Sequence, residues 1–333
     1  MKELLKVENL IVDFAAYNGT VRAVRGVSFT VCEGETLAMV GESGCGKSVT
    51  AKAVMRLLDQ SSAVVSPESS VLYNGKNLLT LPKRKLNQIR GRDIGMVFQD
   101  AMASLNPTMT IGEQIMETIR AHMAVGKTEA SKRAAELLTM VELPDAGELL
   151  KRYPHELSGG QRQRVMIAMA LSCGPKLLIA DEPTTALDVT IQAQILELLQ
   201  KLQKKLNMSV LLITHDLGIV AGIADRVQVM YAGQIVERGT AKEIFTAPKH
   251  PYTAALLTAI PHRNMERRTA LYALPGTPPD LRLELDFCPF AARCRYAMPI
   301  CRREKPEETD NCRCWLRHPM APKVDFMGGE ENA

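Results

Sequence analysis

The run GESGCGKS, from Gly41 to Ser48, constrains the fold of this chain more than any other segment. It matches the pattern GxxxxGK[ST], follows the strand-like run TLAMV and opens a segment with helical periodicity. In a strand, glycine-rich loop and helix of this order, the loop N–H groups and the helix N-terminus face a bound anion. The sequence therefore predicts an α/β fold with a site for nucleotide phosphates.

Each residue type in this loop has a chemical reason to be there. The glycines let the backbone curl so that successive N–H groups face the β- and γ-phosphates, and Lys47 adds a positive charge. The hydroxyl of Ser48 is of the kind that ligates Mg²⁺. The residues predicted to bind nucleotide here are Gly41, Glu42, Ser43, Gly44, Cys45, Gly46, Lys47 and Ser48.

A second segment, LLIADE, supplies two adjacent carboxylates at the end of an apolar run. This pattern predicts a buried strand that emerges beside phosphates, with Asp181 holding Mg²⁺ through water and Glu182 orienting or deprotonating the attacking water. In isolation, the pair would be interpreted as a solvated strand end. The phosphate loop earlier in the chain favours the catalytic interpretation.

Composition excludes several other classes of protein. With 46% apolar and 23% charged residues in 333, the chain is expected to be globular. The net charge of +4 is mild and indicates no nucleic-acid partner. No segment reaches the roughly 20 apolar residues of a membrane-spanning helix, and MKELLKVENL does not resemble a secretory signal. The chain is expected to stay in the cytoplasm, with reduced thiols.

The distribution of periodic segments suggests the domain organisation. Alternating runs in residues 4–40 predict several strands, residues 61–70 a surface loop, and residues 111–151 a mostly helical insertion. After Leu177 a strand, helix, strand rhythm returns, as in a parallel sheet. We predict an ATPase domain over 1–260, with a helical subdomain at about 100–162, and a C-terminal extension over 261–333.

The run LSGGQRQR, from Leu157 to Arg164, closely resembles the signature sequence of ABC ATPases. The resemblance implies a P-loop NTPase (RecA-like) core with an antiparallel β subdomain, a helical insertion and a small Cys-rich C-terminal extension. It also implies a head-to-tail dimer in which the signature contacts the γ-phosphate of ATP bound to the other subunit. The signature residues assigned this role are Ser158, Gly159, Gly160 and Gln161.

Other family motifs follow in the expected order. Gln99 in MVFQD resembles the Q-loop glutamine that senses Mg²⁺ or the attacking water, and His215 in LLITHD resembles the switch histidine at the γ-phosphate. Ala186-Leu187-Asp188 resembles the D-loop, which assigns Asp188 to the nucleotide interface. Alignment to the family places Phe14 at the adenine-stacking position, and Tyr17 is the alternative.

Longer stretches, among them HPYTAALLTAIP, look like the ATPases of dipeptide and oligopeptide importers, a group that includes nickel importers. The implied partners are a second ATPase subunit, the same or related, two membrane-spanning permease subunits and an extracytoplasmic solute-binding protein. The implied location is the cytoplasmic face of the inner membrane, with ATP hydrolysis driving import. A rival class, ABC proteins acting on ribosomes or DNA, is disfavoured because this chain has one cassette and a short insertion.

Five of the eight cysteines crowd into the C-terminal extension. The extension resembles that of importer ATPases in which some members hold a 4Fe-4S cluster, so the resemblance implies thiolate ligands. A Cys₄ zinc site and unligated thiols are the competing interpretations. The fifth thiol, Cys312, leaves the fourth ligand open. The predicted iron-sulfur ligands are Cys288, Cys294, Cys301 and Cys314, with Cys312 as an alternative.

Overall fold

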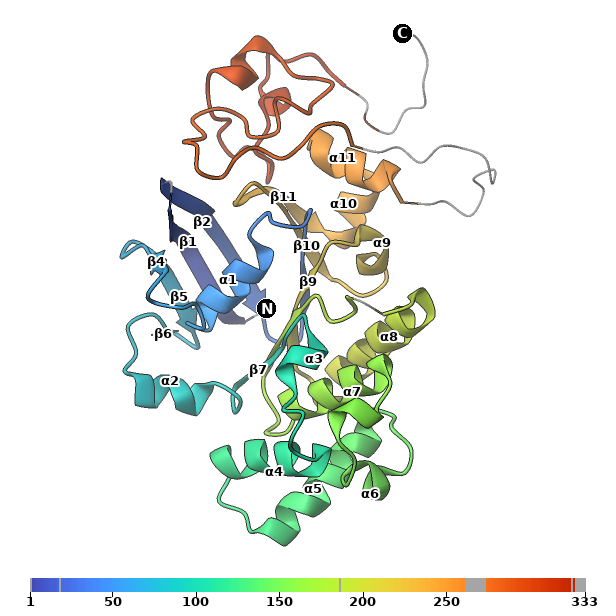
Figure 1. Cartoon of the computed structure of the whole chain (residues 1–333). Helices are drawn as coiled ribbons and strands as arrows, with labels where there is room; N and C mark the ends of the chain where they lie inside the picture. The colour runs from blue at the N-terminus through green and yellow to red at the C-terminus, as the bar shows by residue number, and fades with distance from the viewer. Residues whose placement is uncertain (1, 18, 186, 261–273, 325, 327–333) are drawn as a thin grey trace. The chain divides into compact units, whose positions relative to one another are not determined.

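The structure is a computed structural model that describes residues 2–17, 19–185, 187–260, 274–324 and 326 (Figure 1). The chain forms two compact units, each assembled from separate segments. The first unit comprises the described residues of Met1–Leu5, Thr30–Thr36 and Leu72–Ile213. The second comprises those of Lys6–Phe29, Leu37–Val71 and Thr214–Ala333.

Strands occur along most of the described chain up to residue 240. In chain order they are β1 (Glu3–Ala16), β2 (Gly19–Cys32), β3 (Thr36–Val40), β4 (Ala63–Val65), β5 (Ser70–Tyr73), β6 (Lys76–Asn77), β7 (Ile94–Val97), β8 (Leu177–Asp181), β9 (Ser209–Thr214), β10 (Arg226–Tyr231) and β11 (Gln234–Thr240).

Most helices lie in the first unit. The α-helices are α1 (Lys47–Val54), α2 (Lys83–Ile89), α3 (Ala101–Ser104), α4 (Ile111–His122), α5 (Lys127–Met140), α6 (Ala146–Leu149), α7 (Gly159–Ala170), α8 (Val189–Leu206), α9 (Leu217–Val220), α10 (Ala241–Thr246) and α11 (Pro251–Thr258). The described residues also form short 3₁₀ turns: η1 (Pro154–Glu156), η2 (Pro299–Arg302) and η3 (Trp315–Arg317).

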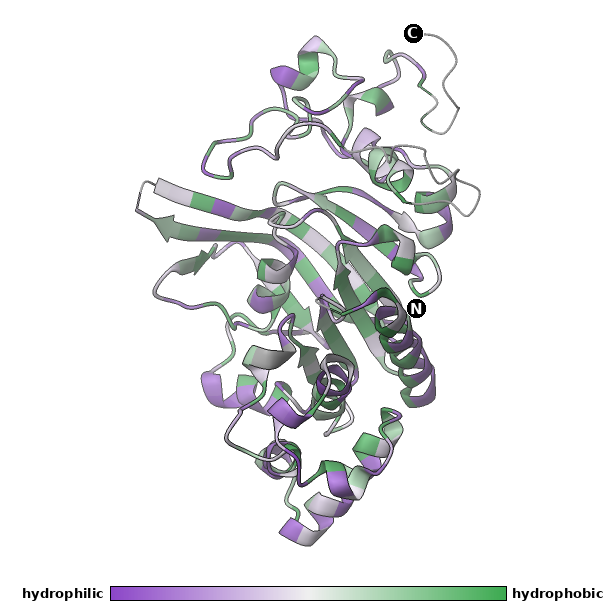
Figure 2. Ribbon diagram, turned by 45° about the vertical axis from the view of Figure 1, so that its right-hand side comes forward, coloured by the Kyte–Doolittle hydropathy of each residue, from purple (hydrophilic) through white to green (hydrophobic). Residues whose placement is uncertain are grey.

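The first unit combines a parallel sheet with a group of helices. β8 pairs in parallel with β7, where Ile94 lies opposite Leu177, and with β9, where Leu177 lies opposite Ser209. Both β8 and β9 are buried along their whole length, and most of their residues are apolar (Figure 2). Helix α7 packs against β7, α4 and α5, and α8 contacts α7. Helix α7 therefore joins the helical segment to the parallel strands.

The second unit is built on β3, β10 and β11. β10 pairs in parallel with β3, where Val40 lies opposite Val229, and antiparallel with β11. β1 lies beside β2 and pairs antiparallel with β4, where Phe14 lies opposite Ala63. All five residues of β3 are buried, and the phosphate loop follows this strand directly. A fully buried strand thus anchors the start of the loop.

The described part of the C-terminal region belongs to the second unit and is bonded to its strand β11. The N–H of Arg313 donates to the carbonyl of Val236 in β11 at 2.8 Å, and the N–H of Arg238 in turn donates to the carbonyl of Asn311 at 2.9 Å. Phe290 and Leu285 enter one hydrophobic cluster together with residues of β3 and β10. The division at residue 260 stays a prediction, but residues 274–324 and the strand that precedes the phosphate loop share a core.

The expected elements agree with the structure in most places. The strands of residues 4–40, the helical insertion and the later strand, helix, strand rhythm are confirmed. The expected loop at 61–70 is wrong in part, because Ala63–Val65 forms β4 against β1. Among the described residues, no helix is both long enough and apolar enough to cross a membrane.

Candidate functional site

The phosphate loop lies between β3 and α1, and its glycines are required by close contacts. A Cβ at Gly41 would lie 2.1 Å from the carbonyl oxygen of Met230, and one at Gly46 would lie 2.4 Å from that of Ala23. Gly44 and Gly46 also have φ of 79° and 107°, a region that favours glycine. The backbone of the loop is therefore fixed by β10 on one side and β2 on the other.

Lys47, the first residue of α1, is 4% exposed, and its side chain points back toward the preceding loop. Its Nζ donates to the carbonyls of Gly41 at 2.7 Å and Glu42 at 3.0 Å and lies 3.9 Å from Sγ of Cys45. Burial raises the pKa of Cys45, although the Lys47 charge lowers it. The ammonium group thus lies inside the curl of the loop, where phosphate oxygens are expected to bind.

The carboxylate pair lies in the other unit, at the end of β8. Asp181 is 1% exposed and Glu182 7% exposed. Glu182 has φ of 46°, and its Oε2 accepts from Nε2 of Gln99 at 3.1 Å and from Oγ1 of Thr185 at 2.9 Å. The structure therefore brings Gln99 and Glu182, both predicted site residues, into direct contact.

The signature forms the N-terminus of α7. Ser158 is the N-cap: its Oγ accepts from the N–H of Gln161 at 3.3 Å, and its own N–H donates to Oε1 of Gln161 at 2.9 Å. This reciprocal capping leaves the two glycines exposed in part at the first turn. Gln161 was predicted to contact nucleotide; the structure gives its side chain a capping role.

A Cβ at Gly160 would lie 2.9 Å from Cγ2 of Ile191, and one at Gly159 would lie 3.2 Å from Leu187. The second glycine is therefore needed for close packing against α8. Asp188 caps α8, since its Oδ1 accepts from the N–H of Ile191 at 3.0 Å. The remaining D-loop residue of the prediction, Ala186, lies outside the described residues.

Three further predicted residues belong to the second unit. His215 follows β9 and is exposed, and Phe14 is half-buried in β1. Tyr17, the alternative for adenine stacking, is fully exposed.

The C-terminal thiols are buried, except for that of Cys294, which is half-buried. The pKa of Cys288 and that of Cys314 are each raised to about 12, mainly by burial and in smaller part by the neighbouring thiols Cys294 and Cys301. Cys312 is fully buried, and Glu237 in β11 contributes to the raised pKa of its thiol. Across the part of the chain that the structure describes, no group of three or more His, Cys, Asp or Glu is placed to hold a metal ion. The predicted iron-sulfur or zinc site is thus not supported.

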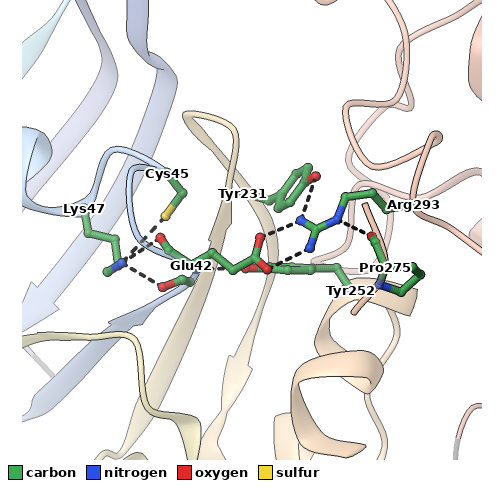
Figure 3. A network of polar contacts seen from close by, with 8 residues as sticks. Glu42, Cys45, Lys47, Tyr231, Tyr252, Pro275 and Arg293 are labelled. Atoms are coloured by element: carbon green, nitrogen blue, oxygen red, sulfur yellow. Dashed lines mark hydrogen bonds and ion pairs between the residues drawn. The ribbon is translucent and has the colours of Figure 1, made fainter. Parts of the chain in front are cut away.

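Sequence reasoning missed two residues that hold the phosphate loop. The N–H of Glu42 donates to the hydroxyl of Tyr252 at 2.9 Å, and the Glu42 carboxylate is paired with Arg293 (Figure 3). Neither partner belongs to a nucleotide-binding motif. Their only sequence signal was their place in segments that resemble the importer ATPases.

The two units therefore carry the parts of a P-loop nucleotide hydrolase: the lysine-bearing loop in one, and the carboxylate pair and signature helix in the other. Residues 24–185 match the family model described as ABC transporter, and residues 236–301 match the one described as oligopeptide/dipeptide transporter, C-terminal region.

Known proteins resemble the chain over nearly its whole length. It is 52% identical over 333 residues to the dipeptide transport ATP-binding protein DppD of Bacillus subtilis, covering 98% of this chain and 99% of that protein. It is 51% identical to the oligopeptide transport ATP-binding protein OppD of Salmonella typhimurium, covering 92% and 90%. A solved dimer of the ATP-binding cassette MJ0796, described as a post-hydrolysis state with ADP and Pi, matches with a TM-score of 0.63 and 30% identity over 71% of this chain and 98% of that chain.

The chain belongs to the dipeptide and oligopeptide transport ATP-binding proteins of the ABC transporter family. Members of this family hydrolyse ATP to power transport. The predicted family and fold class are confirmed.

Proposed function

We propose that this chain hydrolyses ATP to drive the import of dipeptides or oligopeptides through membrane-spanning partner subunits. The observation that carries the proposal is the buried Lys47 inside a glycine loop that tolerates no side chain at Gly41 or Gly46. The peptide substrate rests on relatives at about half identity that are named for dipeptide and oligopeptide transport. The nickel alternative is not favoured by those names.

Each motif residue has a proposed chemical role. When ATP binds, Lys47 exchanges its hydrogen bonds to the carbonyls of Gly41 and Glu42 for contacts with the β- and γ-phosphates. Ser48 and Asp181 hold Mg²⁺. Glu182 orients or deprotonates the attacking water, while Gln99, already bonded to that carboxylate, senses the ion or the water. His215 contacts the γ-phosphate, and Phe14 stacks on adenine.

The proposed assembly is a pair of ATPase subunits, the same or related, bound to two permease subunits and served by an extracytoplasmic solute-binding protein. Ser158, Gly159 and Gly160 of one subunit contact ATP held by the other, with Asp188 at the same interface. The exposed backbone at the start of α7 suits this role, because helix N-termini bind anions. The proposed location is the cytoplasmic face of the membrane.

A substitution at the proposed catalytic carboxylate tests the function. In the assembled transporter, Glu182→Gln is expected to lower ATP hydrolysis at least about a hundredfold, because the amide cannot take a proton from water. The affinity for Mg-ATP should stay within about threefold of the wild type. Glu197→Gln, at an exposed carboxylate of α8, is the matched control and should hydrolyse ATP normally. Wild-type turnover by Glu182→Gln would contradict the assigned role.

A metal group in the C-terminal region is a separate proposal. It rests on the resemblance of the extension to that of importer ATPases: Cys288 and Cys301 lie in one core cluster and Cys294 packs against it, although the described residues are not arranged as a metal site. Four thiolates suit a 4Fe-4S cluster, and zinc is the alternative. Protein purified without oxygen should be brown and contain iron. Colourless protein without stoichiometric iron or zinc would reject the proposal.

A further inference from the structure

The carboxylate of Glu42, the second residue of the phosphate loop, forms a two-pronged ion pair with Arg293 of the C-terminal region (Figure 3). Nη1 of Arg293 donates to Oε2 at 2.6 Å, and Nη2 donates to Oε1 at 2.9 Å. Such bidentate pairs fix direction as well as distance. The pair joins residues that are 251 positions apart in the chain.

The Arg293 side chain is itself held rigidly. It is only 4% exposed, its Nε donates to the carbonyl of Pro275 at 2.9 Å, and Nη1 donates to the hydroxyl of Tyr231 at 3.3 Å. Its guanidinium also lies 5.8 Å from the centre of the Tyr231 ring. An arginine with this many fixed contacts can hold its partner carboxylate in one place.

A second contact holds the backbone of the same residue. The hydroxyl of Tyr252, in α11, accepts the N–H of Glu42 at 2.9 Å. The Tyr252 ring packs against those of Tyr231 and Phe290, with ring centres 4.7 Å and 5.4 Å away. Both the side chain and the N–H of Glu42 are therefore fixed by residues outside the ATPase motifs.

The chemistry of the loop explains why this matters. Its N–H groups and Lys47 attract phosphate, whereas a free carboxylate at the second position would repel it. Arg293 neutralises that carboxylate and holds it toward the C-terminal region. The Glu42 carbonyl, meanwhile, accepts from Lys47 at 3.0 Å, so movement of Glu42 would also move a contact of the phosphate-binding lysine.

We propose that Arg293, in the C-terminal region, and Tyr252, in α11, are positioning residues for the phosphate loop and together set the affinity of this chain for ATP. The inference rests on the proposed ATP site at Gly41–Ser48 and deepens it. Arg293 acts by neutralising and orienting Glu42, and Tyr252 acts by fixing the Glu42 backbone.

Equilibrium titration of the full-length chain with a fluorescent ATP analogue and Mg²⁺ tests the proposal. Arg293→Met is expected to weaken binding about tenfold, because it leaves the Glu42 charge unpaired beside the phosphates. Arg293→Lys keeps the positive charge but cannot form the bidentate pair, so its affinity for the ATP analogue should lie between that of the wild type and that of Arg293→Met. Tyr252→Phe, which loses only the hydroxyl, should weaken binding about threefold to tenfold.

The double variant Glu42→Gln with Arg293→Met separates charge from packing. Binding should return to within about threefold of the wild type, because the repelling carboxylate is gone. Arg282→Met is the matched control: this arginine also pairs with a carboxylate in the C-terminal region, but its partner is the exposed Asp280. In the assembled transporter, Arg293→Met should raise the KM for ATP with little change in kcat.

Two results would overturn the proposal: wild-type ATP affinity in folded Arg293→Met, or an equal loss in Arg293→Met and in the double variant. The second result would mean that Arg293 only supports the fold. Lys47→Ala distinguishes these failures from failure of the ATP site. If Lys47→Ala loses ATP while Arg293→Met does not, the site stands and only the coupling is wrong; if Lys47→Ala binds ATP normally, the proposed site is wrong.

Discussion

At the scale of single residues, Glu182 is held in an unusual conformation. Its φ of 46° is rare for a residue with a side chain and costs about 1 kcal/mol or more. Its carboxylate accepts from Gln99 and Thr185, and its N–H donates to the carbonyl of Ile213 at 2.9 Å. A carboxylate held in one position in this way, at the end of β8, suits the proposed role of Glu182 in orienting the attacking water.

A second buried residue, His250, predicts a pH dependence of stability. Its Nδ1 accepts the N–H of Tyr252 at 3.0 Å, and burial lowers its pKa from 6.5 to about 3. Between these values the unfolded chain binds a proton that the folded chain does not, so the stability present above pH 6.5 is lost as the pH falls. From pH 7 to pH 5 this loss is about 2 kcal/mol.

Urea unfolding of the full chain at several pH values measures this contribution. Asn at position 250 can still cap α11 but does not titrate, so His250→Asn should lose about 2 kcal/mol less than the wild type between pH 7 and pH 5. His318→Asn, at an exposed histidine, is the control and should keep the wild-type dependence. An equal pH dependence in wild type and His250→Asn would contradict the buried, uncharged state of His250.

The sequence predicted the motif residues because each carries its chemistry in a fixed local spacing. Lys47 is buried in its loop and Gln99 meets Glu182. The sequence did not predict Arg293 or Tyr252 as neighbours of Glu42, because contacts between distant segments leave no local periodicity. The capping role of Gln161 was also not predicted, although the spacing of Ser158 and Gln161 is that of a capping box.

At the scale of elements, the strongest patterns were the most reliable. β8, α8 and β9 were predicted in the correct order after Leu177, because buried strands and a long amphipathic helix have clear periods. The helix after the phosphate loop ends at Val54, and Arg56, two residues further on, adopts a φ of 50° that is outside the helical region. β4 was missed because three residues give too short a pattern, and pairing with β1 forms it.

Capping boxes explain where helices α4 and α7 begin. α4 begins at a capping box between Thr110 and Glu113, with Oγ1 of Thr110 accepting from the N–H of Glu113 at 3.3 Å. A second box, at Ser158 and Gln161, starts α7. The same local device thus starts a helix at the beginning of the insertion and at the signature.

At the scale of the whole molecule, the chain distributes its motifs over two compact units. The phosphate loop and His215 belong to the second unit. Gln99, the signature, Asp181 and Glu182 belong to the first unit. The C-terminal region shares a hydrophobic core with β3 and β10 of the second unit. This packing places Arg293 next to Glu42 of the phosphate loop. No local pattern could have predicted this shared core, because it joins residues near 40 with residues near 290.

In the proposed mechanism, ATP is bound between the phosphate loop of one subunit and the signature of another. Light scattering on the Glu182→Gln chain, saturated with Mg-ATP, tests it most directly, alone and with the companion ATPase subunit of its transporter. We predict a dimer holding two nucleotides, which dissociates on removal of Mg-ATP. A Glu182→Gln chain that binds Mg-ATP yet remains monomeric in both samples would contradict the account.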